Sequence, residues 1–304
     1  MCYLGQLLVF EQASEMLSVM RGTDINPKQI ERVCHHYGGV LEEEIRNEIK
    51  EGKVKEYDLQ EKDQTHYVMT DGAMFLTREE SWKEVKLARI FMDDDNLQIN
   101  KERKIITESK YVAHLGSNKE FFPKLEYHID HLRNLVLIGD GAKWIWNWNW
   151  ADDFYSEAVQ ILDYFHAAEH LHEFATCYFG DNDQGKNWVS AQKELLLNDK
   201  ITFVIKNIQN LELSKNTIAE TKRKSLIGYF QRNKKRMLYK TFIDQGFLIG
   251  SGAIESAHRH VLQRRLKLSG QRWTKDGLQQ IANLRVAYES NEWNSVIKKI
   301  KMAA

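Results

Sequence analysis

Residues 134–142 read NLVLIGDGA, and this stretch predicts a short strand in the middle of a sheet. Between Asn134 and Asp140 the residues are apolar or glycine, which is typical of a strand that is buried on both faces. The strand ends at Asp140, and a glycine follows at once. The same Asp-Gly-Ala tripeptide closes a second β-prone run, HYVMTDGA at residues 66–73. The sequence therefore predicts two strands that each end on a carboxylate, at Asp71 and at Asp140.

The segments around these two acids predict an α/β fold with a mixed sheet. Three antiparallel strands joined by short turns are predicted. They are the residues before Asp71, the residues after it and the run EVKLARIFMDD at 84–94. A helix predicted over residues 117–132 then crosses over the sheet. We therefore expect the strand that ends at Asp140 to run parallel to the strand of Asp71.

If the two strands are neighbours, their backbones lie about 4.8 Å apart. Two carboxylates on backbones this close would repel each other without a cation between them. Mg²⁺ takes oxygen ligands of this kind, usually one or two carboxylates and the phosphate oxygens of a substrate. Glu255 is a candidate third acid, because it follows the glycine-rich turn GSG at 250–252 and lies in the first turn of a predicted helix. Each acid also has an ordinary explanation, a turn for Asp-Gly and a helix-dipole contact for Glu255.

The chain divides into four predicted segments. Residues 1–52 predict an N-terminal helical segment with the outline of a helix-turn-helix, although a plain pair of helices is the commoner arrangement. Residues 64–164 carry the predicted strands and form the first part of a core, and residues 165–247 predict a helical insertion. Residues 248–304 predict C-terminal helices that complete the core and carry the third acid.

Five motifs in this chain are long enough to compare with known families. They are MTDGA (69–73), IGDGAKWIWN (138–147), ILDYFHAAEHL (161–171), GSGAIESAHRHVLQRRLKLSGQRW (250–273) and GLQQIANLR (277–285). Together they resemble the DDE transposases of bacterial insertion sequences, specifically the ISKra group with its ISLre-like and Mutator-like relatives. The fourth motif is the most specific of the set, because it is long and unusual.

The resemblance implies an RNase H-like catalytic core that is interrupted by a helical insertion between the second and third acids. By the matching motifs, it implies that Asp71, Asp140 and Glu255 are the catalytic acids and bind Mg²⁺, with Mn²⁺ as an alternative. The implied reaction is DNA cleavage at the end of the element, after which the freed 3′-hydroxyl attacks target DNA. The implied partners are the element ends, the target DNA and further copies of the chain bound to DNA.

Several alternatives remain at this stage. Asp163 in ILDYFHAAEHL competes with Asp140 for the second acid, although we expect Asp163 and His166 to support the site or the fold. A nuclease of the same fold that performs no strand transfer would have the same acids. A decayed or co-opted DNA-binding protein would keep the fold and perform no catalysis. The resembled transposases usually carry a cysteine-rich portion ahead of these helices, so we expect this copy to be either shortened at its N-terminus or read from an alternative start.

The basic residues predict where DNA binds. The chain has 43 basic and 43 acidic side chains, so any attraction to DNA has to be local. The predicted DNA-binding residues follow Glu255 and are Arg259, Arg264, Arg265, Lys267, Arg272 and Trp273, the last as a base-stacking side chain. No apolar stretch of membrane length and no CxxC pair is present, so we expect a cytoplasmic protein without membrane contact. The resemblance to transposases implies that it associates with the nucleoid.

Overall fold

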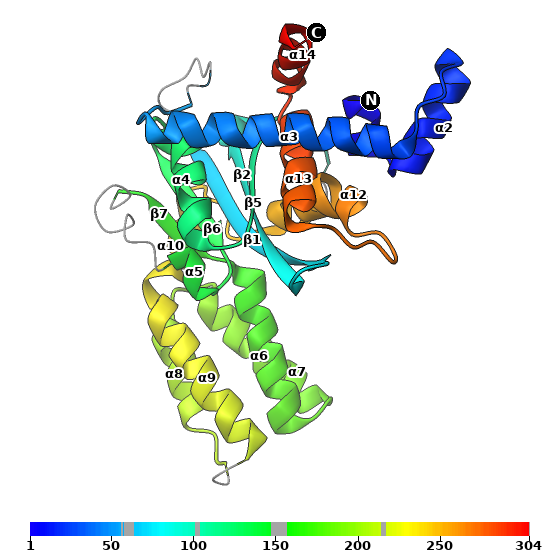
Figure 1. Ribbon diagram of the computed structural model, residues 1–304. Helices are drawn as coiled ribbons and strands as arrows, with labels where there is room; N and C mark the ends of the chain where they lie inside the picture. The colour runs from blue at the N-terminus through cyan, green and yellow to red at the C-terminus, as the bar shows by residue number, and fades with distance from the viewer. Residues whose placement is uncertain (56, 58–63, 101–103, 147–156, 214–216, 304) are drawn as a thin grey trace. The chain divides into compact units, whose positions relative to one another are not determined.

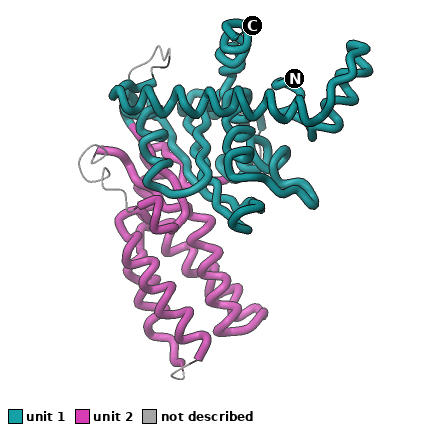
Figure 2. The backbone as a smooth tube through the Cα atoms, in the orientation of Figure 1, with its two compact units in different colours: residues 1–134, 253–304 teal, residues 135–252 magenta. Residues whose placement is uncertain are grey.

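The computed structural model describes residues 1–55, 57, 64–100, 104–146, 157–213 and 217–303. The backbone forms two compact units (Figure 2). Unit 1 comprises Met1–Asn134 and Ala253–Ala304, and unit 2 comprises Leu135–Gly252. Among the described residues, no helix is both long enough and apolar enough to cross a membrane.

An antiparallel three-stranded sheet forms the centre of unit 1 (Figure 1). Its strands are β1 (His66–Thr77), β2 (Ser81–Met92) and β5 (Lys110–Leu115), and β2 lies between the other two. A tight connection joins β1 to β2, with Thr77 paired to Ser81 at the end of the hairpin. The strands are antiparallel, as the sequence predicted, but the two runs predicted on either side of Asp71 form the single strand β1, and the run at 84–94 lies mostly in β2.

β1 runs through Asp71 without a break, so the predicted strand end and turn at this acid are wrong. Asp71 pairs with Leu87, and Gly72 pairs with Lys86 in the same ladder. A methyl group on Gly72 would lie 2.2 Å from Oε1 of Glu84, so the Glu84 side chain occupies the space over this glycine. Gly72 is needed because a neighbouring side chain packs on it, and not because the chain turns there.

The third antiparallel strand, β5, was not predicted. Four consecutive residues of this strand, 111–114, are buried, so the alternation of buried and exposed residues that marks a strand is missing. A small separate hairpin, β3 (Asn96–Gln98) with β4 (Lys104–Ile106), lies in the chain between β2 and β5. Its strands are too short to leave a clear pattern in the sequence.

Unit 1 also contains helices. They are α1 (Cys2–Leu7), α2 (Phe10–Arg21), α3 (Pro27–Lys50), α4 (Asn118–Ile129), α12 (Arg264–Leu266), α13 (Lys275–Glu289) and α14 (Trp293–Met302), together with α11 (Gly252–Ala257), which begins at the last residue of unit 2. α4 and α13 pack on the sheet, and α3 packs against α4 and α13 (Figure 1). α3 begins as predicted: Pro27 occupies the first turn, and the Asn26 side chain accepts a hydrogen bond from the backbone N–H of Lys28.

A buried histidine on β5 should make stability depend on pH. Burial, with a smaller effect of the Lys124 ammonium, lowers the pKa of His114 to about 4, whereas an unfolded histidine titrates near pH 6.5. Between these values the unfolded chain binds a proton that the folded chain does not bind, so acid favours unfolding. We expect His114 to lower the free energy of unfolding by about 2 kcal/mol between pH 7 and pH 5. Urea titrations at both pH values should show this loss in the wild type and a smaller loss in His114→Gln, and equal losses would contradict the prediction.

Unit 2 contains a parallel pair of strands and a bundle of helices. β6 (Leu135–Gly139) pairs in parallel with β7 (Val159–Leu162), and every residue of β6 is buried, as its sequence predicted. The helices are α5 (Lys143–Trp146), α6 (Tyr164–Phe179), α7 (Asp183–Leu196), α8 (Ile201–Gln209), α9 (Ile218–Asn233) and α10 (Tyr239–Asp244). α6 packs against α7 and α9, and α8 packs against α7 and α9. The protein is therefore a mixed α/β protein with antiparallel strands in unit 1, parallel strands in unit 2 and many helices.

Candidate functional site

Asp71 lies in the middle of β1, with about a third of its side chain exposed. Its Oδ1 accepts a hydrogen bond from the N–H of Gly72 at 2.7 Å. Glu84, which packs on Gly72, is held by the Nζ of Lys86 at 2.6 Å, and the same Nζ donates to the carbonyl of Gly116. A second carboxylate therefore lies beside the main chain that carries Asp71, and a buried lysine compensates its charge.

Glu255 lies in the first turn of α11, with an exposed side chain. The start of this helix is tied to β2 by Arg89, which is buried. Arg89 donates from Nη1 to the carbonyl of Ala253 at 3.0 Å and from Nε to Oγ of Ser109 at 2.9 Å. The hydrogen bond to Ala253 holds the helix of Glu255 against β2, the strand next to β1.

His258 connects the helix of Glu255 to Asp71. It comes three residues after Glu255, is 3% exposed, and its Nε2 lies 3.6 Å from Oδ2 of Asp71. Burial lowers the pKa of His258 to about 4, and an interaction with the main chain of Asp71 offsets this only in part. Neither ring nitrogen has a hydrogen bond of normal geometry to a described residue. The neutral imidazole can therefore donate to or accept from a group bound beside Asp71.

The chain around His258 departs from regular α-helix. A π-helical segment, His258–Gln263, follows α11, and such segments occur frequently at functional sites. The sequence analysis did not single out His258. Its position on the buried stripe, next to Ala257 and one turn from Ile254, is the signal that could have placed it in the core.

Asp140 directly follows β6 in unit 2, as predicted. Its Oδ1 accepts from the N–H of Ala142 at 2.9 Å, and its carbonyl accepts from Nε1 of Trp146 at 2.5 Å. A methyl group on Gly141 would lie 1.9 Å from a ring carbon of Tyr229, so this glycine is also covered by a side chain. Burial, with the negative charges of Asp140 and Asp163, raises the pKa of the Tyr229 phenol, which therefore keeps its proton at neutral pH.

Asp163 joins two segments of unit 2. It is 3% exposed and caps α6 by accepting hydrogen bonds from the N–H groups of Phe165 and His166. Its other oxygen accepts from the N–H of Ser251 at 3.0 Å and from the Ser251 hydroxyl. The His166 ring lies at the surface, 3.5 Å from the Glu169 carboxylate. These contacts favour a structural role for Asp163, which fixes the turn that leads to Glu255.

The predicted acids supply only carboxylate oxygens, the ligand type that Mg²⁺ and Mn²⁺ prefer. The unpaired nitrogens of His258 beside Asp71 fit a site that binds a further polar group. Within the part of the chain that the structure describes, no three His, Cys, Asp or Glu side chains gather closely enough to hold a metal ion. The assignment of Asp71, Asp140 and Glu255 as metal ligands therefore stays a prediction.

Four of the predicted DNA-binding residues are exposed on unit 1: Arg259, Arg264, Lys267 and Arg272. The Lys267 ammonium lies 6.0 Å from the ring centre of Trp82, which is 53% exposed. An exposed tryptophan beside a lysine can stack on a base while the lysine neutralises a phosphate. The sequence analysis did not single out Trp82, since nothing in its strand marks it as exposed.

The other two predicted DNA-binding residues are buried, so we remove them from the DNA surface. Arg265 is 1% exposed, its Nε donates to the carbonyl of Gly5, and its guanidinium lies 5.0 Å from the ring centre of Trp273 and 4.8 Å from that of Phe10. Trp273 is 7% exposed, and its Nε1 donates to the carbonyl of Leu266 at 3.0 Å. Both side chains pack the N-terminal helices onto the C-terminal segment.

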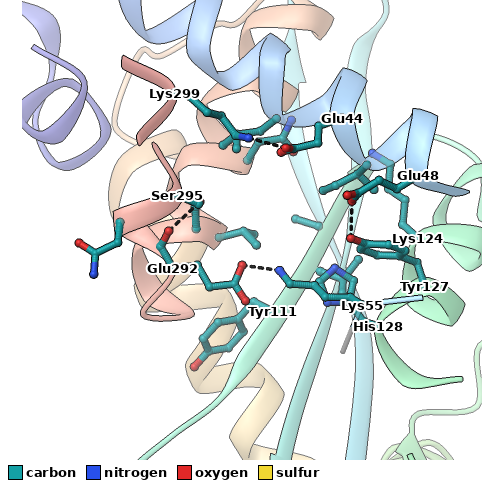
Figure 3. A pocket seen from close by; sticks show the side chains of 18 residues that line it. Glu44, Glu48, Lys55, Tyr111, Lys124, Tyr127, His128, Glu292, Ser295 and Lys299 are labelled. Atoms are coloured by element: carbon teal, nitrogen blue, oxygen red, sulfur yellow. Dashed lines mark hydrogen bonds and ion pairs between the residues drawn. The ribbon is translucent and has the colours of Figure 1, made fainter. Parts of the chain in front are cut away.

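A cavity of about 390 Å³ opens in unit 1 between α3, α4, α13, α14 and β5 (Figure 3). Its charged wall residues face one another in pairs (Figure 3): Lys299 with Glu44 and Lys55 with Glu292. The Tyr127 hydroxyl donates to Glu48. Because these charges are compensated in pairs, the cavity is poorly suited to a polyanion such as DNA, and we do not place the candidate site there.

The comparisons with known proteins address the family. The sequence matches the family model described as "Uncharacterised protein family (UPF0236)" over residues 116–299, more than half of the chain. The matched range contains Asp140, Tyr229, Glu255 and His258, and Asp71 lies ahead of it. A comparison with curated proteins finds no match. The chain therefore belongs to the UPF0236 family.

Proposed function

We propose that this protein is a DDE-type DNA transposase with an RNase H-like core. It would cut DNA at the ends of an insertion sequence and join the freed 3′-hydroxyl to target DNA, at the nucleoid in the cytoplasm. Asp71, Asp140 and Glu255 are the proposed ligands of Mg²⁺. The bound metal would activate the attacking oxygen and stabilise the leaving oxygen of the phosphodiester.

One observation carries most of the proposal: His258 joins the helix of Glu255 to Asp71. Two acids that are far apart in sequence thereby belong to one region of unit 1, on β1 and on a helix tied to β2. A buried, neutral histidine beside a partly exposed carboxylate supports a site that binds a further polar group. The motifs that resemble DDE transposases contain the same two acids and, independently of them, Asp140.

The side chains of this protein have distinct roles in the proposed reaction. The carboxylates of the three acids bind the metal and set its position. His258, neutral at pH 7, orients Asp71 or hydrogen-bonds the attacking water or hydroxyl. Arg259, Arg264, Lys267 and Arg272 are exposed and neutralise phosphates of the bound DNA.

A joining assay tests the proposal. The full chain is incubated with a labelled duplex from the DNA that flanks its gene, with a free 3′-hydroxyl at the element end, and with a supercoiled plasmid as target. We expect labelled plasmid in Mg²⁺ or Mn²⁺ and none in EDTA, because the carboxylates need the metal to act on the phosphodiester.

The assay also separates the two rival functions. A nuclease of the same fold would nick the plasmid in Mg²⁺ and transfer no label to it. A DNA-binding protein without catalysis would shift the duplex in a gel and leave both DNAs unchanged. The first result would show that the protein is a nuclease, and the second that it is a DNA-binding protein without catalysis; either would contradict the proposed transposase.

A further inference from the structure

The end of the β1–β2 hairpin exposes two large apolar side chains. Trp82 on β2 is 53% exposed, and Met74 on β1 is 44% exposed. Trp82 pairs with Leu76, and Met74 lies two residues before Leu76 on the same strand, so Trp82 and Met74 lie on the same face of the hairpin. Exposed apolar side chains that are grouped in this way, and not scattered singly, are a feature of binding surfaces.

The basic segment that follows the π-helical segment is fixed to this end of the hairpin. The N–H of Trp273 donates to the carbonyl of Leu76 at 3.2 Å, and the N–H of Arg78 donates to the carbonyl of Trp273 at 2.8 Å. The Lys267 ammonium lies 6.0 Å from the ring centre of Trp82. The position of this lysine beside the tryptophan is therefore set by the fold, although the two residues are far apart in the chain.

Positive charge is in excess at this surface. Arg78, Lys267 and Arg272 are exposed and form no ion pair with a described residue, and the Nε of Arg78 donates to the carbonyl of Arg272 at 3.3 Å. The acids of the hairpin already have partners within the chain: Glu80 pairs with Lys83 and Lys275, Glu84 pairs with Lys86, and Glu79 accepts from the N–H of Lys275 at the start of α13. Three cations therefore remain available to an anionic partner beside the exposed ring of Trp82.

An aromatic ring among available cations is the combination that binds single-stranded nucleic acid, since the ring stacks on a base and the cations neutralise phosphates. A base inside a duplex is covered on both faces by its neighbours, so only an unpaired or terminal base can stack on Trp82. Trp82 lies opposite Leu76, five residues beyond Asp71 on β1, which is about 17 Å along the strand. The side chains of Asp71 and Trp82 also lie on opposite faces of the hairpin. The stacked base therefore belongs to a nucleotide at some distance from the phosphate that reacts at Asp71.

We propose that Trp82 stacks on an unpaired base of the DNA substrate. The three cations, Arg78, Lys267 and Arg272, neutralise the phosphates on either side of that base. This inference rests on the proposed function, since it takes DNA as the substrate. It adds that the DNA is unpaired at a point away from the reacting phosphodiester, and that this point is recognised without regard to base sequence, because every base has a face that can stack.

The test removes the ring, and separately removes the bases. The full chain is titrated in EDTA, where the proposed chemistry cannot occur, with a labelled single-stranded oligonucleotide and with the same sugar-phosphate chain without bases, and fluorescence anisotropy measures both affinities. We expect Trp82→Ala to bind the oligonucleotide roughly tenfold more weakly than the wild type, because the stacking of one base is lost. Both proteins should bind the chain without bases equally. Trp82→Phe should keep most of the affinity, and the melting temperature should not change, because the Trp82 ring is half exposed.

Phe203→Ala is the matched control. Phe203 is 57% exposed on α8 in unit 2, and the Lys206 ammonium lies 6.0 Å from its ring centre. This lysine follows three residues later on the same helix, so the contact results from helix geometry alone. We expect Phe203→Ala to bind the oligonucleotide like the wild type.

Equal affinity of Trp82→Ala and the wild type for the oligonucleotide would overturn the inference, and so would an equal loss of affinity in Phe203→Ala. Unchanged affinity together with a loss of self-association in Trp82→Ala, measured by light scattering, would assign the surface to a second copy of the chain. The joining assay in Mg²⁺ decides the proposed function separately. Binding through Trp82 without joining would contradict the transposase alone, and joining by a protein whose affinity does not depend on Trp82 would contradict the stacking alone.

Discussion

Asp71→Asn should abolish DNA cleavage and strand transfer while leaving the fold and DNA binding intact. Asparagine has nearly the same shape, and its side-chain oxygen can still accept the hydrogen bond from Gly72 that Asp71 accepts. His258 beside Asp71 is neutral at pH 7, so the loss of the carboxylate charge leaves no unpaired charge on this histidine. A carboxylate that binds a catalytic metal supports several kcal/mol of transition-state stabilisation, so the rate should fall roughly 10³-fold or more.

The joining assay in Mg²⁺ measures this loss, and a gel shift with the same duplex measures binding. Asp93→Asn is the matched control, since Asp93 is an exposed carboxylate in the short helical turn after β2. We expect the control to join DNA at the wild-type rate. Joining of DNA by Asp71→Asn at the wild-type rate would rule out the DDE assignment. An equal loss of joining in both variants would show that the effect comes from removing any negative charge from unit 1, and not from removing a metal ligand.

The sequence predicted whether most segments are helix or strand more accurately than it predicted the residues at which these helices and strands begin and end. β6 was predicted correctly because all five of its residues are buried, and an uninterrupted run of apolar residues and glycine shows this in the sequence. β1 was cut at Asp71, because Asp-Gly is most often a turn and a single chain does not show that Glu84 packs over Gly72. That contact depends on the register of β1 and β2, which is a property of the pairing and not of either strand alone.

Both Asp-Gly pairs illustrate the same limit. Gly72 makes room for a carboxylate from the neighbouring strand, and Gly141 makes room for the ring of Tyr229, 88 positions along the chain. A local pattern indicates that a glycine is needed, but not which side chain needs the space. His258, which lies beside Asp71, and Tyr229, which covers Gly141, were missed because their positions depend on such long-range packing.

The sequence could have shown which of the neighbouring arginines Arg264 and Arg265 is buried and which is exposed. The buried stripe of Ile254, Ala257, Val261 and Leu262 continues at helical spacing to residue 265, so Arg265 falls on the buried side and Arg264 does not. The basic character of the segment outweighed this spacing in the sequence analysis. The structure places the two neighbours in opposite environments, one exposed and one in the core.

Arg264→Ala and Arg265→Ala should therefore have opposite effects. Arg264 is exposed, so its loss should weaken DNA binding, lower the salt dependence by roughly one unit of slope if one phosphate contact is removed, and leave stability unchanged. Arg265→Ala removes a fully buried side chain from between Phe10 and Trp273, together with its hydrogen bond to Gly5. The resulting cavity should lower the free energy of unfolding by about 3 kcal/mol.

Urea titrations and gel shifts at several salt concentrations measure both variants, and each serves as the control for the other because they differ by one position. At temperatures where Arg265→Ala is still folded, we expect it to bind DNA with the wild-type salt slope, since its guanidinium cannot reach a phosphate from the core. A reduced slope in Arg265→Ala with unchanged stability would contradict the buried position and restore Arg265 to the DNA surface. An unchanged slope in Arg264→Ala would show that the DNA follows another path across unit 1, for which the exposed Trp82 and Lys267 are the next residues to replace.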